Sequence, residues 1–259
     1  MARAGRVFGR PDWIASARRS LALIRSQMWR GGRLLATYKD GRAHLAAYLD
    51  DYAFLAAALI ELLQCEYLQA DLDLAEELAE VLLEQFEDRE AGGFFFTAQD
   101  HEKLVHRPKP GHDSALPSGN GVAAFALTRL AALTGEDRYA AAAGRALELF
   151  FPSMLEHPAG FGMLAQALDE ALTPPATLIL RGAPGPLAEW SAALAHEFLP
   201  DTLVLAIPDG TGNLSPVLDK PKRPAPVTGW LCRDFACLEP ATDLEALKRA
   251  CKERGASTE

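Results

Sequence analysis

Cysteine is scarce in this chain, with four residues among 259. Four cysteines are too few to form a disulfide framework for a chain of this length. Only Cys232 and Cys237 are close in sequence, and their C-x4-C spacing is not the two-residue spacing of a thioredoxin motif. No second pair exists to complete a zinc site. We therefore expect two ordinary thiols at the end of a strand, with redox or metal chemistry as the alternative.

A long apolar run is also absent. The longest one, Tyr52 to Leu63, contains Glu61 and is too short to cross a bilayer, and no secretory signal precedes the first expected helix. The formal net charge of -9 argues against a surface for nucleic acid or for an anionic membrane. These absences predict a cytoplasmic protein that binds neither nucleic acid nor a membrane.

Short catalytic signatures are missing as well. The glycines of SGNG do not belong to a phosphate-binding loop, because no G-x-x-x-x-G-K-[ST] is present. Neither H-E-x-x-H nor G-x-S-x-G occurs. No metal ion and no cofactor is predicted from the sequence.

The periodicity of apolar residues is helical up to about residue 172. It predicts helices at about 12–28, 44–66, 71–88, 120–133, 136–154 and 159–172. Asp12 is the expected N-cap of the first. The second and fourth are apolar nearly all round, whereas the third and fifth are amphipathic. An enclosed helix followed by an outward-facing one, repeated after about 65–70 residues, indicates stacked helical hairpins.

The pattern changes after Pro174 and Pro175. ATLILRG, PLAEWSAALAHEFL and DTLVLAIP indicate strand, helix and strand, which is typical of a small parallel sheet. VTGWLCRDFACLEP is expected to add a third strand, and DLEALKRACKERG a closing helix capped by Asp243. The predicted fold is mainly α, with helical hairpins at residues 1–172 and a small α/β subdomain at residues 173–259.

One polar segment, HRPKPGHDSALPSGN, stands immediately before the apolar helix predicted at 120–133. Pro117 resists helical continuation from Leu116, and Ser118 can cap the helix that follows. The free amides at that point carry the positive end of the helix dipole. Such a helix mouth attracts hydroxyl-rich or anionic ligands.

The polar side chains of this segment suit such ligands. Asp113 and Asn120 would form the paired hydrogen bonds that fix sugar hydroxyls, while Arg107 or Lys109 would bind a carboxylate or phosphate. The alternative is a well-capped loop whose polar residues bond only to one another.

A second polar cluster, HLAAYLDDYAFL, lies at the start of the helix predicted at 44–66. Adjacent acids point about 100° apart on a helix, so Asp50 and Asp51 cannot both face one pocket equally. If the inward residue is Asp51, it and Asp113 would form the carboxylate pair that glycoside hydrolysis requires. A capping or salt-bridged aspartate is the alternative. His44 is expected to be a surface or packing residue.

Several motifs together resemble a known family: HLAAYLDDYAFLAAALIELL, GGFFFT, RPKPGHDSALPSGNGVAAFALTRLAALTG and WLCRDFACLEP. They are similar, in order and spacing, to the C-terminal portion of the large bacterial and animal proteins related to spermatogenesis-associated protein 20. Such proteins combine a thioredoxin-like N-terminal domain with a six-hairpin, glycosidase-like (α/α) toroid. The resemblance covers nearly all of the chain and implies kinship in fold with sugar epimerases and glycosidases.

The resemblance also implies a site. It places seven residues around the central pocket of the toroid: Asp51, Tyr52, Arg107, Lys109, Asp113, Ser118 and Asn120. Gly121 stands where relatives commonly have a serine, which would remove one polar contact. Only about three of six hairpins are predicted, so a partial toroid would expose apolar surface. We expect a fragment or split member that pairs with a separately encoded N-terminal half or self-associates.

The function predicted from these features is carbohydrate recognition or processing, with a sugar or sugar phosphate as ligand. Asp51 and Asp113 are the candidate catalytic acid and base. The alternative is a non-catalytic interaction module that supports a thioredoxin-like redox partner, with Cys232 and Cys237 near the contact. A shared fold does not carry a reaction type, so whether the chain is an enzyme stays open.

Overall fold

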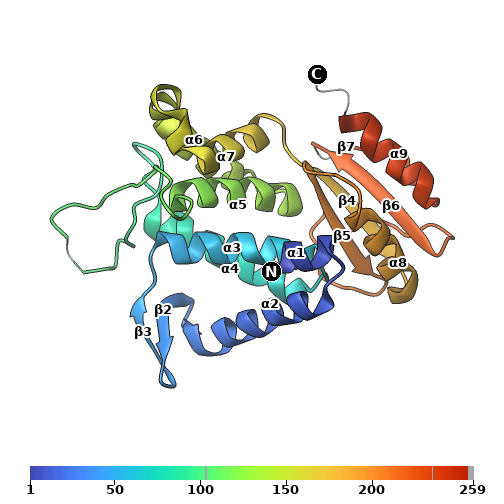
Figure 1. Ribbon diagram of the computed structural model, residues 1–259, viewed down its shortest axis with the longest axis horizontal. Coiled ribbons are helices and arrows are strands. Elements are labelled where there is room, and N and C mark those ends of the chain that lie inside the picture. Colours follow the sequence, from blue (N-terminus) through green and yellow to red (C-terminus); the bar gives the residue numbers. More distant parts are fainter. Residues whose placement is uncertain (103, 235, 256–259) are drawn as a thin grey trace.

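The computed structural model describes residues 1–102, 104–234 and 236–255. The chain is mainly α and consists of a layer of helices followed by a small α/β unit (Figure 1). The first part contains α1 (Ala2–Val7), α2 (Pro11–Leu23), η1 (Ile24–Met28), β1 (Trp29–Arg30), β2 (Arg33–Lys39), β3 (Arg42–Ala46), α3 (Leu49–Leu63), α4 (Gln69–Val81), η2 (Leu82–Phe86), α5 (Gly119–Thr134), α6 (Asp137–Glu156), η3 (Pro158–Gly160) and α7 (Gly162–Leu172). The second contains β4 (Ala176–Gly182), α8 (Pro184–Ala195), β5 (Thr202–Pro208), β6 (Val227–Arg233), β7 (Ala236–Cys237) and α9 (Leu244–Gly255).

Helix α5 is the centre of the helical layer. It packs against α3, α6 and α7, and α4 packs against α3 on the outside. Nearly every residue of α5 is buried, because neighbours cover it on several sides. The prediction that the apolar segments are enclosed and the amphipathic ones lie outside them is confirmed for α3, α5, α4 and α6. Their arrangement as part of a six-hairpin toroid remains a prediction.

Two predictions near the N-terminus were wrong. The helix expected from His44 begins at Leu49, because His44 lies in β3 of a hairpin with β2. The hairpin turns at Asp40 and Gly41, whose φ values of 51° and 76° match the Asp-Gly two-residue turn. Asp12 does not cap the first helix: Arg10 is the N-cap, and its guanidinium donates to the Asp12 carboxylate in the first turn.

The sheet of the α/β unit has the strand order β5-β4-β6-β7. Strands β4 and β5 are parallel and joined by α8, as the sequence predicts, whereas β6 pairs antiparallel with β4. Strand β4 is buried along its whole length, because its two faces pack on different partners. Ile179 belongs to the core of the helical layer, and Leu178 and Leu180 to a second core with α8 and α9.

The junction between the two parts is short. Helix α7 ends at Leu172 and β4 begins at Ala176. The core of the helical layer continues onto the sheet through Ile179 and Leu205. The division of the chain at residue 173 therefore stays a prediction. In the described ranges, no helix is both long and apolar enough to span a bilayer.

Candidate functional site

The two predicted polar clusters lie at one end of the helical layer, which we call the rim. It consists of the first turns of α3, α5 and α7 and of the segments 93–102 and 104–118 (Figure 1). The N–H of Leu49 donates to the carbonyl of Phe96, and a carboxylate oxygen of Asp50 lies against Gly119. The first turns of α3 and α5 therefore lie side by side at the rim.

Asn120 is completely buried at the rim. Its Oδ1 accepts a hydrogen bond from the N–H of Phe94 at 2.7 Å. Its Nδ2 donates to the carbonyls of Phe94 and Pro110, both at 2.9 Å. The amide is thus fully used in holding two loop segments against α5, and its place as a ligand-binding residue stays a prediction.

Ser118 is the N-cap of α5, as predicted. Its Oγ accepts a hydrogen bond from the N–H of Gly121 at 3.1 Å. A Cβ on Gly121 would lie 2.9 Å from Cγ of Met163, so the position lacks room for a serine without movement of that side chain. The glycine is therefore explained by the close approach of α7.

The two predicted catalytic acids both accept hydrogen bonds from the backbone. Asp113 accepts from the N–H of Ser118 at 2.8 Å and from the N–H of Met163 at 2.9 Å, and so links the starts of α5 and α7. Asp51 accepts from the N–H of Tyr48 at 2.9 Å in a capping box. Burial raises the pKa of Asp51. These contacts describe positioning roles, and an acid–base pair stays a prediction.

The other predicted ligand-binding residues are held by the protein itself. The Tyr52 side chain is fully buried, and its hydroxyl accepts from the N–H of Leu34 at 2.8 Å. Arg107 donates to the carbonyl of Thr97 and lies 4.1 Å above the ring of Phe95. Burial lowers the pKa of Arg107.

Lys109 is occupied in the same way. Its Nζ donates to a carboxylate oxygen of Asp88 at 2.9 Å and to the carbonyl of Gly92 at 2.8 Å. Both predicted anion anchors therefore already have acceptors within the chain.

Asp50 was not among the predicted site residues. Its Oδ1 is buried and makes no hydrogen bond among the described residues, and the same holds for Nε of Arg107. A Cβ on Gly119 would lie 2.1 Å from that oxygen, so only glycine fits beside it. Burial and, to a smaller extent, the neighbouring charge of Asp51 raise the pKa of Asp50. The sequence indicated that only one of the two adjacent acids faces a pocket and took Asp51 as the candidate, whereas the carboxylate that lies against α5 is that of Asp50.

A buried ionic network that sequence reasoning missed crosses the helical layer. Arg129 of α5 donates from Nε and Nη2 to the carboxylate of Glu170 on α7, with bonds of 2.8 and 2.6 Å. Its Nη1 lies 3.3 Å from Glu61 of α3, which also faces Arg6 at 3.9 Å. The signal was available, because Glu61 and Arg129 interrupt otherwise apolar helices.

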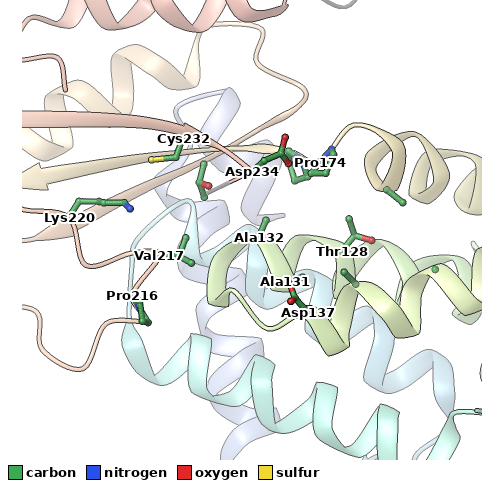
Figure 2. Close-up of a pocket in the computed structure, with 15 residues that line it drawn as sticks. Thr128, Ala131, Ala132, Asp137, Pro174, Pro216, Val217, Lys220, Cys232 and Asp234 are labelled. Atoms are coloured by element: carbon green, nitrogen blue, oxygen red, sulfur yellow. The ribbon is translucent and has the colours of Figure 1, made fainter. Parts of the chain in front are cut away.

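A separate cavity of about 490 Å³ lies where the helical layer meets the sheet (Figure 2). Its walls come from the end of α5, the first half of α6, the end of α7, the start of β4 and the segment 216–220. Seven of the fifteen lining residues are alanine or proline, and polar groups come from Lys220, Thr177, Asp137 and Asp234. Nothing in the sequence pattern pointed to this cavity, because its walls meet only in the folded chain.

Cys232 and Cys237 form a disulfide between β6 and β7, so the expectation of two free thiols was wrong. The residues are direct partners in the antiparallel register, which places both side chains on the same face of the sheet. Cys232 also lines the cavity. Across the described ranges, no group of three or more His, Cys, Asp or Glu side chains is arranged to hold a metal ion.

Comparison with curated proteins identifies long relatives of this chain. The human spermatogenesis-associated protein 20 is 27% identical over 259 residues, which cover 92% of the chain and 33% of the relative. The rat protein of that name is 28% identical over 93% of the chain and 33% of its own length. The chain is distantly homologous to spermatogenesis-associated protein 20.

The mouse protein matches at 28% identity over 76% of the chain and 26% of its own length. The chain thus spans about a third of the length of the first of these relatives. No protein-family model matches the chain. The homology supports the family resemblance of the motifs, while the six-hairpin arrangement and the carbohydrate function remain to be tested.

Proposed function

We propose that α2 to α7 form part of a six-hairpin ring and that the rim recognises a hydroxyl-rich small molecule, a sugar or a sugar phosphate. The alternation of enclosed and outer helices supports the ring, because α3, α5 and α7 are neighbours and α4 and α6 pack outside them. The greater length of the relatives leaves room for further hairpins to share the same rim.

The observation that carries the proposal is the carboxylate of Asp50. A buried carboxylate oxygen without a hydrogen bond is costly, and because the Asp50 side chain is only half-buried, a rotation of the carboxylate would let a hydroxyl donor of a ligand satisfy it. Around it, Asp113, Asn120 and Ser118 fix the loops and helix starts through backbone contacts. In this proposal they hold the geometry of the site, and Asp50 contacts the ligand.

The proposal is limited to recognition. Asp51 and Asp113 each accept hydrogen bonds from backbone N–H groups, and these contacts support a positioning role more directly than an acid–base role.

The second candidate function is an interaction module for a thioredoxin-like redox partner. One observation favours it, since a disulfide is the group on which such a partner acts and Cys237 is only partly buried. A thioredoxin-like protein that forms a mixed disulfide with Cys237 and not with a Cys237→Ser variant would support this function.

A thermal-shift screen with neutral sugars and sugar phosphates tests the rim. We expect a ligand to raise the melting temperature of the parent chain and of Asp169→Asn, which makes the same chemical change at an exposed position of α7. Asp50→Asn should lose most of the shift. A broad screen without any stabilising sugar, or an equal shift in Asp50→Asn, would contradict the proposal.

A further inference from the structure

The cavity of Figure 2 has a different character from the rim. Its volume of about 490 Å³ lies within the range of pockets that enclose small organic ligands. Small apolar side chains form its middle, among them Ala131 and Ala132 of α5 and Pro216 of the proline-rich segment. Gly144 of α6 adds no side chain, and a Cβ there would meet no atom within 4 Å. The middle of the cavity therefore suits an apolar group.

Within the described ranges, four polar groups of the cavity are unpaired, whereas the hydroxyl of Thr128 in the same lining donates to the carbonyl of Ala124. The ammonium of Lys220, the hydroxyl of Thr177 and the carboxylates of Asp137 and Asp234 take part in no hydrogen bond or ion pair between described residues. Thr177 is only 5% exposed, so bulk water has little access to its hydroxyl, whereas Lys220 is half-buried and Asp137 and Asp234 are exposed to solvent. Groups of this kind, gathered around an apolar space, are what a ligand would satisfy.

Of the three charged side chains, Lys220 and Asp234 stand at opposite ends of the cavity, and Asp137 lies at the start of α6. Figure 2 shows Lys220 on one side with its nitrogen directed toward the apolar middle, and Asp234 beside Pro174 on the other. A molecule that met both would carry an anionic group at one end and a cationic group at the other.

Asp234 directly follows β6 and has a φ of 49°. Two residues before it, Cys232 is joined by a disulfide to Cys237 of β7. Left-handed backbone is adopted more readily by Asp and Asn than by most residues, so Asp234→Asn keeps this backbone conformation while removing the charge.

We propose that this cavity binds a small zwitterion with an apolar body, such as a short apolar peptide. Its carboxylate pairs with Lys220, its ammonium pairs with Asp234, and its apolar side chains lie against the alanines and prolines between them. The hydroxyl of Thr177 is available to the peptide group. This site is independent of the rim and of any sugar bound there.

Calorimetric titration of the chain with the dipeptide Leu-Phe, and with its N-acetyl and C-amide forms, tests each end separately. We expect saturable binding of the free dipeptide and about tenfold weaker binding, or more, of each blocked form, because each loses one charge-assisted contact. Equal binding of all three forms, or no binding of any apolar dipeptide from Ala-Ala to Leu-Phe, would overturn the proposal.

Substitutions of Lys220 and Asp234 test which charged end of the dipeptide each residue binds. Lys220→Met should weaken the free dipeptide about tenfold and leave the C-amide form unchanged, and Asp234→Asn should do the same with the N-acetyl form unchanged. Lys222→Met and Asp219→Asn are matched controls outside the lining and should bind as the parent does. An effect of Lys220→Met that is equal on free and amidated dipeptide would refute the pairing.

A filled cavity supplies the last test. Gly144→Leu places a side chain in open space of the lining, and replacing a glycine inside a helix favours the helix, so we expect a folded protein by circular dichroism. This variant should lose dipeptide binding, whereas Gly144→Ala should retain most of it. Parent-like binding by a folded Gly144→Leu would place the ligand elsewhere and refute the site.

Discussion

Replacement of Asn120 by alanine tests whether this side chain anchors the loops of the rim or contacts a ligand. The change removes three hydrogen bonds, two to the backbone of Phe94 and one to the carbonyl of Pro110. At a net value of about 1 kcal/mol for each bond, the loss is about 3 kcal/mol. The N–H of Phe94 is left buried and unpaired, which adds to this cost. We expect the free energy of unfolding to fall by about 3–4 kcal/mol without any ligand present.

Urea titration followed by far-ultraviolet circular dichroism measures this free energy. Glu148→Ala, an exposed change on α6 with no contact to the rim, is the control and should alter the free energy by less than about 0.5 kcal/mol. A loss in Asn120→Ala as small as that of the control would refute the anchoring role. It would instead favour the earlier hypothesis that the amide of Asn120 serves a ligand.

Three further predictions concern the cap, the buried ions and the raised pKa of Asp50. Ser118→Ala should lower the free energy of unfolding by about 1 kcal/mol and Ser118→Thr should keep most of it, in the same titration, because only a side-chain oxygen caps α5. Arg129→Met should cost about 3–5 kcal/mol, since Glu170 is left buried and unpaired, and the double variant with Glu170→Leu should recover much of the loss; additive losses would contradict the pairing. The pKa of Asp50 is raised above its ordinary value of 3.8, so its contribution to stability is complete below that pH and is lost as the pH rises through the folded-state pKa. Asp50→Asn should therefore exceed the parent in free energy of unfolding at neutral pH, and this advantage should vanish below pH 3.8; a pH-independent difference would refute the assignment.

Local patterns were sufficient for the helices and for the parallel strands. Helices α4, α5 and α6 follow from apolar spacing, and Ser118 from its place before an apolar run. The hairpin β2–β3 was missed although Asp40 and Gly41 form the strongest short hairpin signal, because the apolar residues after His44 were assigned to the helix. The Asp-Gly turn signal was present, but the longer run of apolar residues after it was given more weight.

The partners of polar side chains were not predictable in this way. The two acids 50 and 51 differ by one position, and the capping box at Tyr48 decides which of them turns back and which faces α5. The disulfide depends on the antiparallel register of β6 and β7, and the cavity depends on how closely the sheet approaches α5 and α6. Such facts come from tertiary packing, which a residue pattern in one segment does not contain.

The ion network of Arg129 bears on how firmly the helices keep their alignment. A slip of α5 by one turn would move its guanidinium about 5.4 Å along the layer, away from both carboxylates. Helices that meet only through alanine side chains can shift along one another at little cost. A buried charge that loses its partner makes the same shift unfavourable. We therefore expect Arg129, Glu170 and Glu61 to vary together among homologous sequences. A homologue should have either all three charged residues or apolar residues at all three positions.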